Sequence, residues 1–478
     1  MYASTTSVAL VGGEARVVEV QVHVGRQQEA FKLSGLPDTA VREAKDRVKA
    51  AIMSSGVRFP NRTVTVNLAP ADLPKRGTDF DLPIAIGVLA ASGEVPVLHQ
   101  AVAVGELALD GSVRAGMASI GAAVLSARTG APCLVARDVA SRAAVVPGST
   151  VFGVTSLADA VDFVRRGPGS RDAQTPANDD AAASPAPDLS EVQGQQLAKR
   201  ALEIAAAGGH HLLFHGPPGG GKTMLARRLP GILPALTGEQ AVEVSLIHSA
   251  AGLVRPMAKT PPFRSPHHTA SRAALVGGGS GLPVPGEVSL AHHGVLFLDE
   301  LAEFPRGNLD TLRQPLEDGF VTIARKGITM RFPSMFHLVA ATNPCPCGFH
   351  GDRRKPCECR PSQVVRYRQR VSGPLLDRID LVVKMGRVET MTLGTVDGEG
   401  STAVQARVLA AVRFGDEADG GIDPDAERMI VNALEAGLIT ARGATRVSRL
   451  SRTIANLAAS EIVTEEHVSE AMALRAEW

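Results

Sequence analysis

Two hydrophobic periodicities alternate along the first third of the chain. Apolar residues recur at every second position in residues 16–24 (RVVEVQVHV) and 62–69 (RTVTVNLA), a spacing typical of half-buried strands. Residues 39–56 and 82–93 follow helical patterns instead. Strands that alternate with helices indicate an α/β or α+β domain, which we place at residues 1–166.

A change in composition separates this domain from the rest of the chain. Residues 167–187 lack aromatic and large aliphatic side chains and are rich in Pro, Ala, Gly and Asp, so they predict a flexible linker. Residues 188–385 again alternate apolar strands with helices and predict a second α/β domain. Strand signals then fade, and segments such as 423–438, which opens with an Asp cap, predict a helical domain over 386–478.

Composition narrows the class of protein and its surroundings. The chain has 478 residues, of which 44% are hydrophobic and 21% charged, values that are ordinary for a globular protein of several domains. Its formal net charge is only +1, so binding to nucleic acid would depend on a local basic surface. The N-terminal segment has no basic leader, and no run reaches the roughly 18 apolar residues of a membrane helix. These features predict a cytoplasmic protein without a membrane partner.

A glycine-rich segment between a strand and a helix is the first candidate site. Residues 210–229 (HHLLFHGPPGGGKTMLARRL) combine an apolar strand, a turn and a helix that begins near Lys222, which is the context of a P-loop. Backbone N–H groups would hold the phosphates of ATP, Lys222 would neutralise the β- and γ-phosphate oxygens, and the Thr223 hydroxyl would bind Mg²⁺. A glycine-rich turn with an incidental lysine is the alternative. The predicted ATP-binding residues are Gly216, Pro217, Pro218, Gly219, Gly220, Gly221, Lys222 and Thr223.

Two later strands end in polar side chains that suit the same chemistry. Residues 294–300 (GVLFLDE) deliver Asp299 and Glu300 at the carboxyl end of a strand, the edge where parallel sheets bind ligands. Asp299 would bind the magnesium shell and Glu300 would polarise the attacking water. Asn343 ends the next apolar strand and would orient that water. Alone, an Asp–Glu pair is usually a solvated loop and a strand-end Asn a turn former, but their succession after a P-loop favours catalysis.

Four of the five cysteines lie close together in the sequence. They form two CxC pairs, Cys345 with Cys347 and Cys357 with Cys359. Side chains two positions apart on an extended segment point to the same side, so the two pairs can close a tetrahedral thiolate site. This predicts a structural zinc ion in an insertion at 345–359, with free reduced thiols as the alternative. The residues between and after the pairs are basic, which suits nucleic acid or an ordinary solvated face.

Together these motifs resemble AAA+ ATPases. GPPGGGKT, LFLDE and ATNP are similar to AAA+ nucleotide motifs, and FRSPHHTASRAALVGGG and SGPLLDRIDL look like the magnesium-chelatase-like branch. The resemblance is strongest to the ComM/YifB family, and it includes the N-terminal string LSGLPDTAVREAKDRVKAAI. It implies a Lon-protease-like (ribosomal S5 domain 2-like) α+β domain, then a P-loop AAA+ α/β domain with a C-terminal helical lid.

The function implied by the resemblance is that of a DNA motor. Members of the family are known as AAA+ proteins with DNA branch-migrating helicase activity linked to natural transformation. The resemblance implies a hexameric enzyme that uses ATP and magnesium, binds single-stranded or branched DNA and promotes branch migration, with a recombinase as a further partner. A magnesium-chelatase motor subunit would share the ATP motifs but not the Lon-like front or the CxC pairs. An ATP-gated scaffold that never translocates is the third interpretation.

The resemblance also assigns roles to basic residues outside the P-loop. Arg378 in LLDRID resembles the arginine finger that reaches the ATP of a neighbouring subunit. Arg442 is similar to the second sensor on the lid, with Arg446 as its rival. A surface ion pair or a solvated side chain is the alternative for each arginine.

DNA contacts are implied on two segments that would project into the pore of the ring, a hairpin at 319–332 and an insertion at 250–285. On the hairpin, Arg325, Lys326 and Arg331 become candidate phosphate contacts, or else the ribbon is merely basic on its exposed faces. In the insertion, His267 and His268 would either line the pore or form a turn that packs.

The Lon-like domain departs from the protease pattern at its active site. In the protease fold, a serine precedes an apolar helix and a lysine lies on a later helix. The matching positions carry Asp81 and Ile120, so neither nucleophile nor base is present. We expect a non-proteolytic domain that assists assembly or guides DNA.

Overall fold

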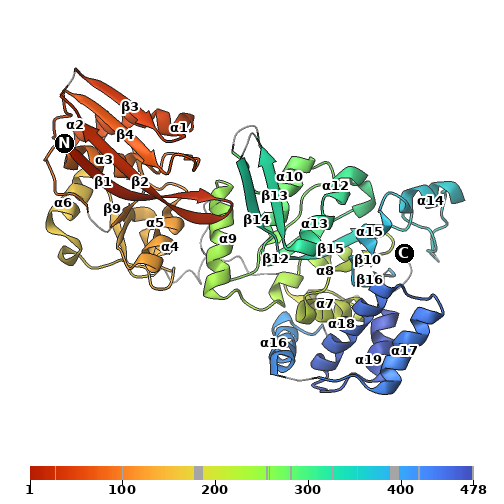
Figure 1. The fold of residues 1–478 in the computed structure, drawn as a ribbon. Helices are drawn as coiled ribbons and strands as arrows, with labels where there is room; N and C mark the ends of the chain where they lie inside the picture. Colours follow the sequence, from red (N-terminus) through yellow and green to blue (C-terminus); the bar gives the residue numbers. More distant parts are fainter. Residues whose placement is uncertain are drawn as a thin grey trace.

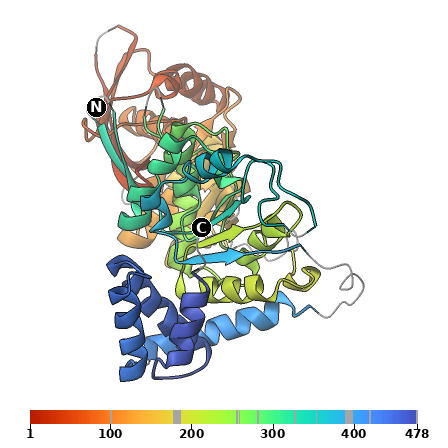
Figure 2. The same ribbon diagram turned by 90° about the vertical axis from the view of Figure 1, so that its right-hand side faces the viewer.

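The computed structural model has three parts, which follow one another in chain order (Figure 1). The helices of the C-terminal part group at the end of the molecule opposite the N-terminal domain (Figure 2). The structure describes the whole chain apart from residues 27, 99–100, 177–186, 254–256, 258, 280–281, 326–327, 353, 388–397, 418–419 and 476–478.

The N-terminal domain is built on a mixed sheet, whose seven described strands run in the order β3-β4-β2-β1-β5-β8-β9. The antiparallel members are β1 (Tyr2–Val11), β2 (Glu14–Val24) and β4 (Thr63–Ala69). The other four are joined in parallel to a neighbour: β3 (Ala30–Ser34), β5 (Val102–Ala103), β8 (Cys133–Ala136) and β9 (Val151–Val154), with β5 next to β1. A separate ribbon joins β6 (Glu106–Leu107) to β7 (Val113–Arg114). The expected mixture of strands and helices is confirmed.

Helices cover this sheet and complete its core. They are α1 (Thr39–Arg42), α2 (Ala44–Ser54), α3 (Asp81–Ala91), α4 (Ser119–Thr129), α5 (Arg137–Ala143) and α6 (Leu157–Arg166). Nearly every residue of α3 is buried, because this helix packs against β1 and β2 as well as against α2 and α6. In β2 the alternation predicted from the sequence buries Val18, Val20 and Val22 on the helix-covered side.

The start of the predicted linker packs on the N-terminal domain. The guanidinium of Arg171 pairs with Asp159 at 2.6 Å, and the N–H of Gln174 donates to the carbonyl of Val151 at 2.7 Å. An ion pair and a hydrogen bond at the edge of the sheet therefore order residues that composition assigned to the linker. The centre of the linker, residues 177–186, lies outside the described residues.

The central domain is built on a parallel sheet, whose five described strands run in the order β11-β12-β15-β10-β16. They are β11 (Phe263–Arg264), β12 (Gly294–Leu298), β15 (Phe336–Thr342), β10 (Leu212–His215) and β16 (Leu381–Lys384). All neighbouring pairs are parallel, so the carboxyl ends of the strands meet at one edge. Because β10 lies between β15 and β16, the chain leaves β10 at the crevice where such sheets bind ligands.

Both faces of the central sheet are buried. Leu212 and Phe214 of β10 belong to a core shared with the lid, whereas Leu213 belongs to the core on the other face. The helices of this domain are α7 (Gln196–Gly208), α8 (Lys222–Ala226), α9 (Gly238–Ala250), α10 (Arg272–Val276), α11 (Glu287–Leu290), α12 (Arg306–Asp310), α13 (Arg313–Asp318), α14 (Pro361–Arg368) and α15 (Gly373–Leu376). The hairpin of β13 (Phe320–Arg325) and β14 (Ile328–Pro333) stands beside the sheet (Figure 1).

The C-terminal part is helical, as predicted. It contains α16 (Ser401–Glu417), α17 (Pro424–Glu435), α18 (Ala441–Leu457) and α19 (Glu465–Ala473). Apolar residues of these helices join α7 and the central sheet in one hydrophobic core. The chain then returns to the sheet, where Arg475 forms a bridge with Val382 of β16. This shared core attaches the helical part directly to the central domain.

Helix α9 connects the first two domains. It packs against α4, β1 and β2 of the N-terminal domain, and its Glu243 accepts from His292 at 3.2 Å and from His293 at 2.7 Å, directly before β12. The Nδ1 atom of His292 accepts the N–H of Met335, so the proton of the neutral ring is on Nε2 and is donated to Glu243. Although these three side chains have metal-ligand chemistry, the tautomer leaves His292 Nε2 without a lone pair for a cation.

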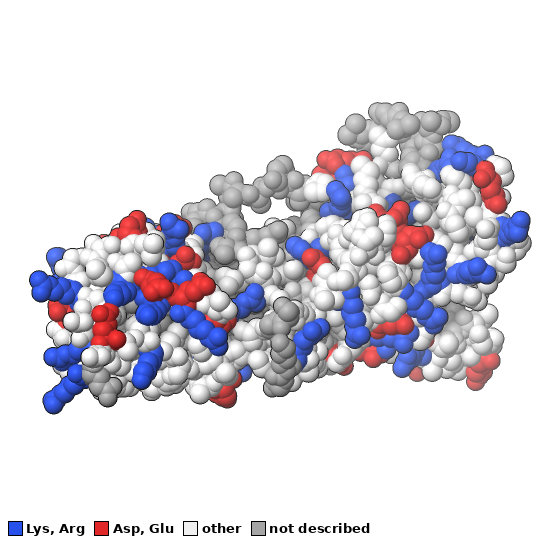
Figure 3. All heavy atoms as spheres, turned by 90° about the horizontal axis from the view of Figure 1, so that it is seen from above, with Lys and Arg blue, Asp and Glu red and all other residues white. Residues whose placement is uncertain are grey.

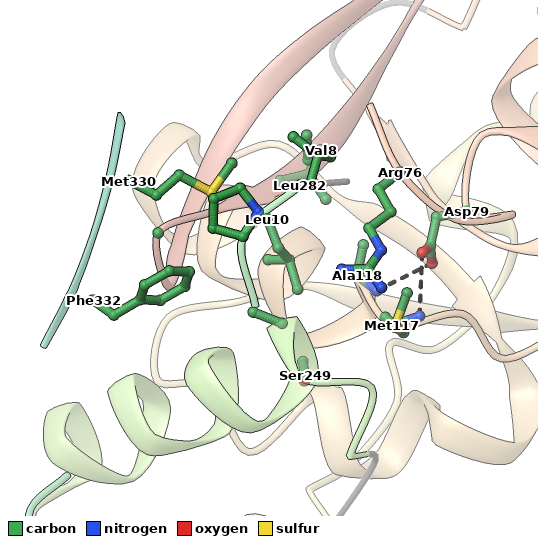
Figure 4. A pocket seen from close by; sticks show the side chains of 14 residues that line it. Val8, Leu10, Arg76, Asp79, Met117, Ala118, Ser249, Leu282, Met330 and Phe332 are labelled. Atoms are coloured by element: carbon green, nitrogen blue, oxygen red, sulfur yellow. Dashed lines mark hydrogen bonds between the residues drawn. The ribbon is translucent and has the colours of Figure 1, made fainter. Parts of the chain in front are cut away.

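A small cavity of about 40 Å³ also lies between these domains (Figure 4). Val8 and Leu10 of β1 face Met330 and Phe332 of β14 across it. Gly12, in the turn after β1, lies so close to Arg331 of the hairpin that an added Cβ would stand 2.6 Å from its carbonyl oxygen. The base of the hairpin therefore rests on the N-terminal domain, and the cavity is too small for a nucleotide.

Candidate nucleotide site

The predicted P-loop lies at the carboxyl edge of the central sheet. The chain ends β10 at His215 and starts α8 at Lys222, and the turn between them follows the sequence prediction. Gly219 and Gly221 adopt φ angles of +79° and +86°, which favour glycine, and an added Cβ at Gly216 would stand 2.2 Å from the carbonyl oxygen of Met385. Gly219 and Gly221 therefore allow the turn, and Gly216 allows the chain after β16 to approach closely.

Lys222 lies at the centre of the site. Its side chain is largely buried, and its ammonium donates to the carbonyls of Gly216 at 2.6 Å and Pro217 at 2.9 Å and to Asn343 Oδ1 at 3.1 Å. Burial lowers the pKa of Lys222 to about 8, although Asp299 and Glu300 favour its charged form. Below that pH the lysine is an ammonium held inside the loop, ready to bind an anion.

The two predicted magnesium ligands meet across the sheet edge. The hydroxyl of Thr223 donates to Asp299 Oδ2 at 2.7 Å, and the N–H of Glu300 donates to Asp299 Oδ1 at 2.9 Å. A hydroxyl and a carboxylate at the end of a P-loop fit the hard oxygen ligands that Mg²⁺ takes beside phosphates. The predicted group of Lys222, Thr223, Asp299 and Asn343 is thus brought together, although these residues come from three separate segments.

Glu300 has a neighbour that the sequence reading placed elsewhere. The carboxylate of Glu300 lies 3.4 Å from Nδ1 of His268, whose ring stacks on His267 at 4.0 Å and meets Phe304 edge-on. Glu300 adopts a φ of +52°, an uncommon conformation for a residue with a side chain. Nδ1 of His267 bonds to the hydroxyl of Thr269 at 2.9 Å, which fits the turn that was one of its two predicted roles. No pattern in the sequence indicates that His268 faces the carboxylate of Glu300.

Gln195 is a second site residue that sequence reasoning missed. Its amide donates to the carbonyl of Gly220 at 3.0 Å and to the carbonyl of Gly386 at 2.7 Å. It therefore ties the P-loop to the chain that leaves β16 toward the lid. Gln195 lies directly before α7 and has a left-handed φ of +54°. The sequence does not reveal that conformation, so it could not mark Gln195 as a site residue.

The basic residues assigned by resemblance occupy different places. Arg378 pairs with Glu317 and donates to the carbonyl of Pro374, and it makes no contact with the P-loop among the described residues. Arg442, in the first turn of α18, is exposed and has no ion pair within the described part of the chain. Arg378 is therefore engaged away from the nucleotide site of its own chain in this conformation.

Arg446, the rival to Arg442, has a structural role. Its guanidinium pairs with Asp380 at 2.6 Å, and Asp380 also accepts the N–H of His211 at 2.9 Å. Asp380 and His211 directly precede β16 and β10, so they mark the amino edge of the sheet. The P-loop lies at the carboxyl edge, about 13 Å away along a four-residue strand. Arg446 is thus excluded as a nucleotide sensor in this arrangement.

The candidate DNA contacts do not share one face of the hairpin. Arg325 ends β13 opposite Ile328, whereas Arg331 lies opposite Thr322 with its guanidinium 3.3 Å from the centre of the Phe320 ring. Strand alternation points these two arginines to opposite faces. Both are exposed. Lys326 lies outside the described residues.

The four predicted zinc ligands converge. Sγ of Cys345 lies 3.3 Å from Sγ of Cys347 and 3.6 Å from Sγ of Cys357, and the sulfurs of all four cysteines, Cys359 included, fall within 4.8 Å of one another. A tetrahedral zinc site with four thiolates has sulfurs about 3.8 Å apart, so the group fits a single Zn²⁺. Cys133 is buried in the N-terminal core, and burial raises its pKa to about 12.

The position that matches the protease serine is occupied by a buried ion pair. Arg47 donates to Asp81 through Nε at 2.6 Å and through its terminal nitrogen at 3.0 Å. Burial raises the pKa of Asp81 to about 6 against the lowering effect of Arg47. Ile120 lies on α4 and offers no proton acceptor. The structure thus shows a carboxylate committed to an arginine where a nucleophile would be needed.

Three family models match this chain. Their descriptions are "Magnesium chelatase, subunit ChlI" over residues 188–393, "Subunit ChlI of Mg-chelatase" over residues 18–138, and "Magnesium chelatase, subunit ChlI C-terminal" over residues 398–475. The chain is 41% identical to the uncharacterized protein YifB of Escherichia coli, over 98% of this chain and 96% of YifB. It is 40% identical to the competence protein ComM of Haemophilus influenzae, again over 98% of this chain and 96% of ComM.

The chain belongs to the magnesium chelatase subunit ChlI family. This is a family of AAA-type ATPases, so the resemblance inferred from GPPGGGKT and LFLDE is confirmed at the level of the family. The N-terminal part is 33% identical to Lon protease 2 of Bacillus subtilis over 136 residues, which make up 27% of this chain and 25% of that protease. The expected Lon-like character of the first domain is therefore confirmed as a similarity. No helix in the described part of the chain is long and apolar enough to cross a membrane.

Proposed function

We propose that this protein is a cytoplasmic DNA motor, a ring of six subunits that hydrolyses ATP to drive branch migration during recombination or transformation. The observation that carries the proposal is the candidate ATP site, in which Lys222 donates to Asn343 and Thr223 donates to Asp299. Its family consists of AAA-type ATPases, and a full-length relative is named as a competence protein. A recombinase that pairs DNA strands is the natural partner for such a motor.

The residues of the site divide the work of hydrolysis. ATP would displace the carbonyl contacts of Lys222 with phosphate oxygens, since a buried ammonium interacts more strongly with an anion than with a neutral carbonyl. Thr223 and Asp299 would hold magnesium, which neutralises charge on the phosphates. Glu300 is free to polarise water once it leaves His268, and Asn343 would hold that water in line.

Arg378 supports a ring. The Arg378 side chain is 11% exposed and pairs with Glu317, away from the P-loop of its own chain. A contact between this guanidinium and a γ-phosphate therefore requires a neighbouring subunit. A head-to-tail contact of that kind closes into a ring when its rotation allows. A ring would bring the exposed tips of the β13–β14 hairpins together around one axis. That geometry concentrates positive charge although the net charge of the chain is only +1.

DNA binding by the hairpin gives the first test of the proposal. Replacing Arg325 and Arg331 together with Ala is expected to raise the Kd for single-stranded DNA about tenfold and to flatten the salt dependence by about 0.7 per lost phosphate contact. Fluorescence anisotropy at several salt concentrations measures both quantities, and a synthetic four-way junction measures branch migration. Arg16→Ala, which removes an exposed arginine of β2, is the matched control. DNA that neither binds nor stimulates ATP hydrolysis would leave the chelatase-type motor or the ATP-gated scaffold as the better description.

Zinc removal gives a second test. The purified protein is expected to contain about one zinc ion per chain, and Cys357→Ser is expected to lose most of it and to unfold at a lower temperature, because metal binding contributes to local folding. Elemental analysis and a thermal melt supply the two readings. Cys133→Ala removes a thiol outside the cluster and should retain the zinc. A wild-type protein purified without chelators that holds no zinc would refute this assignment.

A further inference from the structure

A basic cavity lies beside the P-loop, under the loop that carries the cysteines. Its volume is about 540 Å³, more than ten times that of the cavity between the domains. His215, Gly216 and Pro217 form one wall, and the chain after β16 and the cysteine loop form the others. The phosphate-binding residues Lys222 and Thr223 do not line it. The cavity therefore adjoins the nucleotide site and shares Gly216 and Pro217 with it.

The cysteine loop is fixed on the P-loop by close packing. Gly348 has a φ of +85°, and an added Cβ there would stand 2.7 Å from Cδ of Pro218. Phe349 lies between two cations, with Lys355 at 4.2 Å and Arg387 at 5.3 Å from its ring centre. The cysteine loop, which forms one wall of the cavity, is thus fixed by the contact of Gly348 with Pro218 and by the cations around Phe349. The predicted zinc ligands lie on the same loop.

The acidic side chain in the cavity is already committed. Asp352 pairs with Arg387 at 3.0 Å, and its Oδ1 accepts the N–H groups of Arg354 at 2.7 Å and Lys355 at 3.1 Å. Only 5% of the Asp352 side chain is exposed. It therefore neutralises Arg387 and shapes the loop, and within the described residues it forms no ion pair with the other cations of the cavity.

Those other cations are Arg354, Arg368 and Lys384, none of which forms an ion pair among the described residues. Nε of Arg368 is buried without a hydrogen-bond partner in that part of the chain. Burial and, to a smaller extent, the positive charges of Arg368 and Lys384 lower the pKa of His215 to about 4. On the face seen in Figure 3, basic and acidic side chains are interspersed. Unpaired like charges around one cavity repel, and an anion between them relieves that repulsion.

We propose that this cavity binds a phosphate group of a second ligand, held by Arg354, Arg368 and Lys384 while the P-loop holds ATP. Phosphate is the matching chemistry because guanidinium groups bind its oxygens in pairs and a lysine adds a point charge. The phosphate belongs either to the backbone of single-stranded DNA or to a second nucleotide. The first source rests on the proposed DNA motor, whereas the second does not. In either case the ligand touches Gly216 and Pro217, the residues whose carbonyls accept from Lys222.

The experiment compares two ligands on the full-length protein. The variant Arg354→Gln with Lys384→Gln removes two cavity cations without disturbing Arg368, which lies next to the core. Arg366→Gln is the matched control, because Arg366 is exposed on α14 and does not line the cavity. Fluorescence anisotropy measures the Kd of a short oligothymidylate, and equilibrium dialysis counts bound ATP. Thermal melts confirm that each variant is folded, and the single variant Lys384→Gln replaces the double variant if the latter unfolds.

If the phosphate belongs to DNA, the double variant is expected to weaken oligothymidylate binding about tenfold, several times more than any change in the Kd of ATP. The control variant should bind oligothymidylate with a Kd within about twofold of wild type. For the nucleotide source, the wild type binds a second, weaker ATP that the double variant loses while oligothymidylate binding is unchanged. Unchanged values for both ligands would overturn the proposal. A wild type that binds no oligothymidylate at all would count against the DNA motor, and the ATP count would still decide the cavity.

Discussion

Lys222→Ala is expected to raise the Kd for ATP at least a hundredfold. Glu300→Gln is expected to bind ATP with a Kd within about threefold of wild type, but to hydrolyse it a hundred to a thousand times more slowly. The difference follows from the site. Lys222 provides the buried positive charge inside the loop, while Glu300 stands outside the loop at the end of β12 and touches neither P-loop backbone nor Lys222 among the described residues.

Binding of a fluorescent ATP analogue and a steady-state phosphate-release assay measure these two effects separately. Glu303→Gln is the matched control, because Glu303 is a nearby exposed carboxylate that pairs with Arg370 and does not reach the nucleotide site. We expect its turnover to stay within about twofold of wild type. Equal turnover of Glu300→Gln and wild type would remove Glu300 from the chemistry, and unchanged ATP binding by Lys222→Ala would remove the P-loop assignment.

The second large effect is expected when variant and wild-type subunits are mixed. If Arg378 completes the site of the next subunit, a random mixture of equal parts Arg378→Ala and wild type leaves only about 2% of six-membered rings without a variant subunit. Activity on branched DNA should then fall far below half, because a motor that works around a ring is interrupted by one incomplete site. Measuring branch migration against the fraction of variant gives a curve well below a straight line.

Glu317→Gln separates this role from the ion pair that Arg378 makes in its own chain. That change removes the carboxylate partner of Arg378 but keeps the guanidinium, so it should leave mixed rings active to within about twofold. A half-exposed carboxylate of this kind contributes little to stability. A decline in strict proportion to the fraction of Arg378→Ala, together with a protein that sediments as a monomer in ATP and DNA, would exclude the ring.

The nucleotide site could be predicted because Asp299 and Asn343 directly follow buried strands, and Lys222 and Thr223 begin the helix that follows a third. β10, β12 and β15 are short apolar runs, and the polar residue after each run must lie at the carboxyl edge whatever the strand order is. The same logic applied to the cysteines, since two CxC pairs in an extended chain have few other ways to place their sulfurs together. Local chemistry and spacing were sufficient in these cases.

Residues that enter the site from helices and loops could not be predicted in the same way. His268 and Gln195 reach Glu300 and Gly220 only because α10 and α7 pack where they do, and no periodicity records such packing. The choice between Arg442 and Arg446 as the second sensor likewise depended on which edge of the sheet faces α18. Residues 168–176 read as linker because their composition is polar, yet the ion pair of Arg171 with Asp159 holds them on the first domain.

The sequence by itself determined the ATP chemistry, the cluster of four cysteines and the loss of the protease residues, since each depends on side-chain type and on spacing along one strand or turn. The tertiary structure alone decided that the cysteine loop lies on the P-loop through Gly348 and Pro218, and that α9 joins the first domain to the strand that carries Asp299. Those contacts join segments more than a hundred residues apart or in separate domains. Their free energy comes from burial and charge pairing across interfaces that no local pattern encodes.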